Sequence, residues 1–185
     1  MKPIGLLMRE HRLIERMVDL TSKQVSEIDK TGKVDLDFIE AAADFFRTYA
    51  DRTHHGKEEE ILFRDLAKKA LSKEHKEMVD GLIADHIFGR RLVSSLAVAR
   101  ENYIQGKPDS VADIAACMSE LVKLYPAHIE REDKRFFVPS MEYFSQEEQD
   151  KMLQEFLDFD QKMIHEKYQT IIEGLSKSII KSVST

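Results

Sequence analysis

The chain has 185 residues, a net charge of −6 at neutral pH, 42% hydrophobic residues and 34% charged residues. This length suffices for one domain with a sizeable core, and the acidic balance argues against nucleic acid or an anionic membrane as the main partner. Four prolines, seven glycines and no tryptophan favour an all-α chain. The single cysteine, Cys117, allows no internal disulfide. Because the apolar run at the start is also too short for a signal peptide, we expect a cytoplasmic protein.

The spacing of apolar residues predicts five helices. They are expected over about 4–28, 35–71, 73–105, from about 111 to Pro139, and from Ser145 to about 180. Short connections predict an up-down-up-down four-helix bundle over residues 1–143. The additional C-terminal helix, within 144–185, is expected to pack on the bundle or extend it.

Local signals mark the predicted helix boundaries. Gly32 is expected to cap the first helix, and Ser145 and Glu148 have the spacing of a capping box at the start of the fifth. Gly56, in the middle of the second helix, predicts a kink or a close contact. Pro126 predicts a kink in the fourth helix, because proline lacks a backbone N–H.

One motif occurs in both the second and the fourth predicted helix. His55 and Glu59 stand four residues apart, as do His128 and Glu132, and an aromatic residue follows each pair about two turns later. Residues four apart share one face of an α-helix, so each copy presents an imidazole and a carboxylate to the same side. That pairing suits iron, manganese or zinc. One such pair is a weak signal, and two copies about 73 residues apart are a stronger one.

The first and third predicted helices each add one histidine at a similar depth. Counted from the shared loops, one histidine of each helix lies within about 5 Å, or one turn, of a common level of the bundle. The predicted ligands are His11, His55, Glu59, His86, His128 and Glu132. Six such ligands are too many for one tetrahedral zinc ion and suit two metals bridged by carboxylate.

These residues resemble the hemerythrin-like family, the His-His-Glu cation-binding domain. The resemblance covers about residues 4–140 and rests on four motifs. They are the lone His11 of the first helix, His-His-x-x-Glu-Glu-x-x-Leu-Phe from His54 to Phe63, His86 of the third helix, and His-x-x-x-Glu followed by Phe and Pro from His128 to Pro139. The resemblance implies a four-helix bundle with two iron ions in an oxo- or hydroxo-bridged centre, for which manganese or zinc are possible substitutes. Members of the family bind or sense dioxygen, sense iron, or handle peroxide and nitric oxide.

The chain departs from the respiratory hemerythrin pattern at Arg90. That pattern has a second histidine here, four residues after the first one in the third helix, so one ligand is absent or comes from elsewhere. The alternatives for it are His54, Glu15 and His165. Asp133 matches the bridging aspartate of that pattern and competes with Glu132, which the internal repeat favours.

We therefore expect a non-haem di-iron protein that binds or senses dioxygen or a related small oxidant, such as peroxide or nitric oxide. An altered ligand set that leaves an open metal position suits such reactivity. The alternatives are a di-iron enzyme that consumes peroxide or nitric oxide, and an iron-responsive regulatory or interaction module. We expect no nucleic acid or membrane partner, and the sequence leaves a homo-oligomer and the role of the C-terminal helix open.

Overall fold

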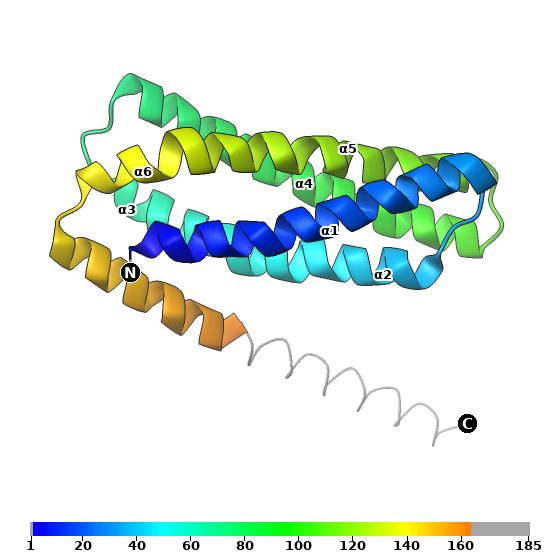
Figure 1. Cartoon of the computed structure of the whole chain (residues 1–185), viewed down its shortest axis with the longest axis horizontal. Coiled ribbons are helices and arrows are strands. Elements are labelled where there is room, and N and C mark those ends of the chain that lie inside the picture. The colour runs from blue at the N-terminus through cyan, green and yellow to red at the C-terminus, as the bar shows by residue number, and fades with distance from the viewer. Residues whose placement is uncertain (1, 164–185) are drawn as a thin grey trace, which may run out of the picture.

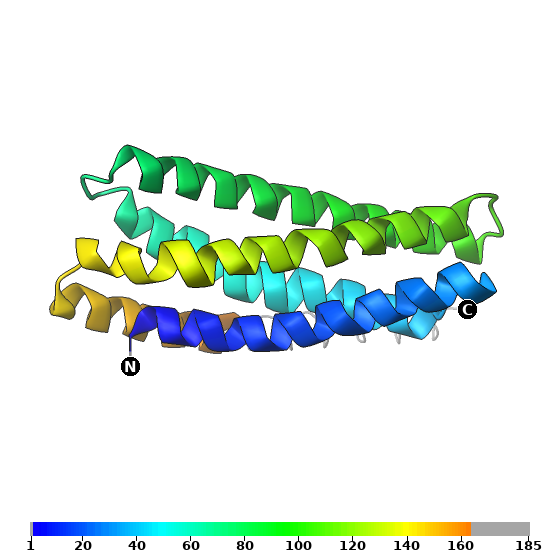
Figure 2. The ribbon, with the colours of Figure 1, turned by 45° about the horizontal axis from the view of Figure 1, so that its top comes forward.

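The structure is a computed structural model that describes residues 2–163. Four long helical rods run antiparallel to their neighbours in the chain (Figures 1 and 2). The first rod is α1 (Pro3–Thr31) and the third is α4 (Lys73–Ile104). The second rod joins α2 (Leu36–Phe45), η1 (Phe46–His55), η2 (Glu58–Phe63) and α3 (Arg64–Leu66). The fourth rod joins α5 (Ser110–Arg131), η3 (Glu132–Phe136) and α6 (Phe137–Ser140).

A short 3₁₀ turn, η4 (Met141–Tyr143), leads from the fourth rod to a further helix over 146–163. The described part of the chain contains no strand, so the predicted all-α bundle with an extra C-terminal helix is confirmed. Within residues 2–163, no helix is both long and apolar enough to cross a membrane. The predicted end of the last helix, near 180, lies outside the described residues.

The helix boundaries follow from the expected capping chemistry. Gly32 adopts a left-handed conformation with φ of 68° and donates its N–H to the carbonyl of Ile28 at 2.7 Å. The side chain of Asp35 begins the second rod by accepting the N–H of a residue three positions later at 3.0 Å. Ser145 and Glu148 form the predicted capping box, with reciprocal hydrogen bonds of 3.2 and 2.8 Å.

Two predicted boundaries differ from the structure: the second rod ends at Leu66 instead of near 71, and the fourth rod continues one residue past Pro139. Pro139 lies inside α6, and helical backbone continues to Ser140 before the 3₁₀ turn begins. The π-helical segment η3 directly precedes α6 and already departs from the regular α-helical hydrogen bonds. The missing N–H of Pro139 therefore interrupts a ladder that has already changed its pattern. Pro126 lies within α5, which is continuous from Ser110 to Arg131.

Two apolar cores lie along the rods, with polar residues between them. One core contains residues such as Ile14, Ala50, Val93 and Tyr125, and the other contains Leu7, Ile61, Leu82 and Phe136. On the first three rods, the histidines of the predicted site fall in sequence between the members of the two cores, and on the fourth rod His128 directly precedes Ile129, the last member of the first core. The fold therefore places these histidines in a polar layer with apolar packing on both sides.

The helix over 146–163 packs on the second core. Met152 and Phe156 are buried there together with Ile4 and Leu62. Figures 1 and 2 show this helix near the N-terminal half of α1. The described part of this helix is therefore in contact with the bundle.

Candidate metal centre

Five histidines and two glutamates meet in the polar layer. All seven side chains are buried, with at most 3% of each residue exposed. They are His11 from α1, His54 and His55 from η1, Glu58 from η2, His86 from α4, His128 from α5 and Glu132 from η3.

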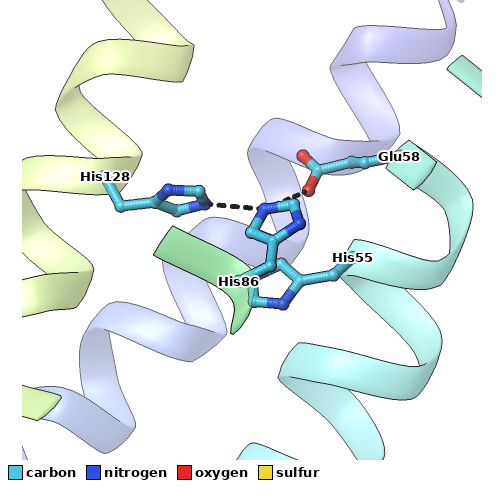
Figure 3. A group of neighbouring side chains, drawn as sticks. All are labelled: His55, Glu58, His86 and His128. Atoms are coloured by element: carbon cyan, nitrogen blue, oxygen red, sulfur yellow. Dashed lines mark hydrogen bonds and ion pairs between the residues drawn. The ribbon is translucent and has the colours of Figure 1, made fainter. Parts of the chain in front are cut away.

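These side chains form two overlapping groups that could each hold a metal ion. In either group, one ligand atom from each residue lies within 4.8 Å of all the others. The first group is His55, Glu58, His86 and His128 (Figure 3). The second group is His11, His54, Glu58 and Glu132. Glu58 belongs to both groups.

Glu132 also contacts both groups. Its Oε2 lies 3.2 Å from Nε2 of His11 and 3.3 Å from Nε2 of His128. Figure 3 shows His86 between His128 and Glu58. Nε2 of His86 lies 3.3 Å from Nε2 of His128 and 3.4 Å from Oε2 of Glu58. The ring of His55 stacks on that of His86 with centroids 3.8 Å apart. Two carboxylates are thus shared between two sets of imidazoles.

The π-helical segments explain why adjacent residues of the second rod both reach the layer. A π-helix has a wider turn than an α-helix, so neighbouring residues are rotated less from one another. His54 and His55 end the segment η1, and Glu58 begins η2. Glu132 begins η3 in the fourth rod. Such segments occur often at functional sites.

Every imidazole has a carboxylate behind its Nδ1. The distances range from 2.7 to 3.4 Å. The pairs are His11 with Asp133, His54 with Glu10, His55 with Asp51, His86 with Glu59, and His128 with Asp85. A proton on Nδ1 that is donated to a carboxylate leaves the lone pair on Nε2, the nitrogen that faces the layer. Histidines that bind metals in proteins almost always have such a partner.

Each of these carboxylates is in turn paired with a cation. Asp133 contacts Arg12, Glu10 contacts Lys57, Asp51 and Glu59 contact Arg90, and Asp85 contacts Arg131. The cations fix the carboxylates, and the carboxylates fix the rings. The orientation of the five imidazoles is therefore set by a complete outer layer of charged residues.

Most of the inner atoms lack hydrogen bonds, whereas Nε2 of His86 and Nε2 of His128 lie within hydrogen-bonding distance of each other at 3.3 Å. Among the described residues, Nε2 of His11, His54 and His55 and both carboxylate oxygens of Glu58 and Glu132 have no hydrogen-bond partner. Burying a polar atom without a partner costs about 1–3 kcal/mol. So many unpaired nitrogen and oxygen atoms facing one another fit the requirements of a bound cation, which would pair with all of them.

Burial keeps two of the inner histidines neutral, the form that binds metals, whereas neighbouring carboxylates favour the protonated form of a third. Burial lowers the pKa of His54 and His55 well below the ordinary value, and nearby cationic groups lower it further. These rings are therefore neutral. Burial also lowers the pKa of His11, but the bonds to Asp133 and Glu132 outweigh it and raise this pKa to about 9.

The two shared carboxylates differ in how their surroundings shift their pKa. Burial raises the pKa of Glu58 well above its ordinary value, and Glu132 raises it further. Burial acts in the same direction on Glu132, but His128 and His11 outweigh it and lower its pKa. A bound cation would relieve the mutual repulsion of these carboxylates.

The structure brings together five of the six residues predicted from the sequence as ligands. His11, His55, His86, His128 and Glu132 all belong to the two groups. The exception is Glu59, whose Oε1 accepts from Nδ1 of His86 and from Arg90, at 2.7 Å each. Glu59 therefore supports an imidazole from outside, and its neighbour Glu58 points into the layer.

The sequence repeat was aligned one residue out of register. His54 and Glu58 are four apart, 3.4 Å from each other, and match His128 and Glu132 in both spacing and position. Shifting the repeat by one residue would have found both missed members. The repeat of His55 and Glu59 looked equally good because two histidines and three glutamates are adjacent here.

The structure also places the remaining alternatives, except for one. His54 completes the second group, and Asp133 lies outside it as the partner of His11. Glu15 is half-buried and pairs with Arg12 outside the layer. His165 lies outside the described residues.

Comparison with known families agrees with this arrangement. A search of curated proteins and a search of solved structures gave no match. Residues 2–139 match the family described as the hemerythrin HHE cation binding domain. This match spans most of the chain and includes every residue of the two groups, so the chain belongs to the hemerythrin HHE cation-binding family.

Proposed function

We propose that the two groups hold a pair of iron ions, and that the protein binds or senses dioxygen or a related small oxidant such as peroxide or nitric oxide. The observation that carries the proposal is the set of five inward Nε2 atoms around two shared carboxylates. Each Nε2 belongs to a ring whose Nδ1 is already engaged by a carboxylate. This arrangement leaves one free ligand atom per ring.

The donor types are compatible with iron. Five imidazoles and two carboxylates without a thiolate form a set that suits iron, manganese or zinc. Bundle cores use carboxylate-bridged pairs of this kind for di-iron centres. Iron bound here would supply the redox chemistry through which dioxygen, peroxide or nitric oxide reacts. Glu58 and Glu132, which contact both groups, would hold the two ions together.

The two groups offer different ligands to the two ions. The first group supplies three imidazoles and Glu58, whereas the second supplies two imidazoles, Glu58 and Glu132. Arg90 stands where the respiratory pattern has a histidine, and it pairs with Asp51 and Glu59 instead of reaching the layer. Each group offers four residues as ligands, so an ion held in either would keep a position open to an exogenous ligand.

A cavity reaches the first group from the surface. It has a volume of about 240 Å³ and is lined by residues that include His55, Arg90 and Tyr125. Tyr125 is buried, and its ring stacks on that of His55 with centroids 6.2 Å apart. A space of this size admits a small molecule and excludes a polymeric substrate. Arg90, held by two carboxylates, is part of the lining of this cavity.

The test is iron loading of the full chain without oxygen, followed by metal analysis and an optical spectrum before and after air and peroxide are added. We expect two irons per chain and new absorption in the near-ultraviolet and blue after oxidation. A chain that takes up no iron, or that takes it up without any spectral response to the oxidants, would contradict the proposal.

The same preparation separates binding from turnover. An enzyme would consume repeated additions of peroxide when loaded with iron, and the variant His86→Ala would not. A single stoichiometric spectral change without further consumption would identify a binder or sensor. Both outcomes require the iron centre.

A further inference from the structure

The helix over 146–163 reaches the metal centre through one chain of charges, in which Lys57 and Glu10 are buried and Asp160 is partly exposed. Asp160 of this helix accepts from Nζ of Lys57 at 2.5 Å. The same ammonium group donates to Oε1 of Glu10, and Oε2 of Glu10 accepts from Nδ1 of His54 at 2.8 Å. His54 belongs to the second group. A residue 106 positions away along the chain is thereby connected to a candidate ligand by three consecutive contacts.

This connection differs from the other four outer pairs of the centre. The cations Arg12, Arg90 and Arg131 are between 34% and 56% exposed, so water can also solvate them. Lys57 is fully buried. A buried ammonium group must have its charge compensated by nearby carboxylates. Within the described chain, the carboxylates on Nζ of Lys57 are those of Glu10 and Asp160.

The position of the helix depends on close packing at two points. Phe156 is fully buried in the second core. Gly56, next to Lys57, has no side chain where Phe159 approaches, and a Cβ atom there would lie 2.8 Å from Cζ of the phenyl ring. The glycine predicted to mark a close contact thus lets this helix approach the second rod. Asp160 follows Phe159 directly.

We propose that Asp160 is a positioning residue of the metal centre. We also propose that docking of the helix over 146–163 on the bundle and retention of metal by the centre stabilise each other. This inference rests on the proposed function. With Asp160 in place, Lys57 shares its charge between two carboxylates, and Glu10 remains a strong acceptor for the proton on Nδ1 of His54. Without Asp160, the ammonium group of Lys57 interacts with Glu10 alone. Glu10 is then a weaker acceptor for the proton on Nδ1 of His54.

The direct test uses Asp160→Asn in the full chain, with iron(II) added anaerobically against a competing chelator. We expect the affinity for one of the two irons to fall about 10–100-fold, the range typical when a partner behind a ligand is lost. The affinity for the other iron should change much less. Asp160→Glu should restore part of the loss.

The matched control is Asp158→Asn. Asp158 lies on the same helix, is exposed and pairs with Gln154 on the surface. This variant removes the same charge without touching Lys57, so its iron binding should equal that of the wild type. An equal loss of affinity for both irons in Asp160→Asn would assign Asp160 to general stability and overturn the inference. Unchanged iron affinity in this variant would also overturn it.

A second measurement needs no variant and covers the case in which Asp160→Asn fails to fold. Coupling between two sites is reciprocal, so an effect of docking on metal affinity requires an equal effect of metal on docking. Iron loading of the wild type should slow hydrogen exchange of the amides in 146–163. Exchange there that is identical with and without iron would overturn the inference. A wild-type chain that binds no iron would instead contradict the proposed function.

Discussion

Glu58 and Glu59 are adjacent carboxylates with opposite surroundings. Glu58 is fully buried and belongs to both groups of the centre. The side chain of Glu59 is 28% exposed and is bonded to His86 and Arg90. Because the two neighbours differ so much in burial, comparing their variants tests directly which of them is a ligand.

We predict that Glu58→Gln abolishes tight binding of both irons, because both ions would lose the shared carboxylate. Glu59→Gln should keep two irons per chain and lower their affinity about 10–100-fold, since it disturbs only the partner of one ligand. Glu60→Gln, at an exposed position, is the control and should bind as the wild type does. Metal titration against a competing chelator measures these affinities. A larger loss of iron affinity in Glu59→Gln than in Glu58→Gln would show that Glu59, and not Glu58, is the ligand.

The raised pKa of His11 predicts how the metal-free protein responds to pH. In the folded chain this pKa is about 9, against 6.5 ordinarily. The folded state therefore binds the proton more tightly than the unfolded state between these values. The stability from His11 is fully present below about pH 6.5 and is lost as the pH rises through about 9, at about 1.4 kcal/mol per pKa unit.

Asp133→Asn should reduce this dependence, because it removes a bond that raises the pKa of His11. We expect urea unfolding of the metal-free wild type to show a larger loss of stability between pH 6.5 and 9.5 than unfolding of the variant. Equal losses in the two proteins would show that Asp133 does not hold the charge of His11.

At the scale of elements, the sequence predicted the rods and most of their ends. Apolar spacing located all four rods, and Gly32, Asp35 and Ser145 end or begin helices through ordinary capping. The π-helical segments could not be predicted, because their wider turns depend on what the rods pack against. Strict α-helical geometry selected His55 and Glu59 as one face, and the wider turns instead bring His54, His55 and Glu58 to the layer together.

Replacement of a helical glycine by alanine should have opposite effects on stability at Gly56 and at Gly81. A Cβ on Gly56 would lie 2.8 Å from the ring of Phe159, whereas one on Gly81 would make an ordinary 3.5 Å contact with Arg131. We predict that Gly56→Ala destabilises the protein by about 1–3 kcal/mol through overpacking. Gly81→Ala should be neutral or stabilising by up to about 1 kcal/mol, because alanine favours helix.

Urea unfolding of both variants, followed by circular dichroism, measures this difference. Limited proteolysis adds a local readout, since Gly56→Ala should expose the helix over 146–163 to cleavage earlier than Gly81→Ala does. If Gly56→Ala were as stable as Gly81→Ala, the helix would not be packed against this glycine.

At the scale of the whole molecule, the bundle consists of two apolar cores with a polar layer between them. Short loops fix the antiparallel order of the rods, and for this reason the depth of each histidine could be estimated from sequence to within about one turn. The rotation of each rod about its axis could not be estimated as well. That rotation decides which of two adjacent carboxylates faces inward, and it is set by side-chain packing such as that of Phe46 and Phe136 in the cores.

The central claim is that two irons lie between Glu58 and Glu132, each surrounded by one of the two groups of residues. Anomalous diffraction from crystals of the iron-loaded chain, recorded at the iron absorption edge, tests it most directly. We predict two peaks about 3.5–4 Å apart, both adjacent to the carboxylate of Glu58. A single peak, or peaks away from the five Nε2 atoms, would contradict the account.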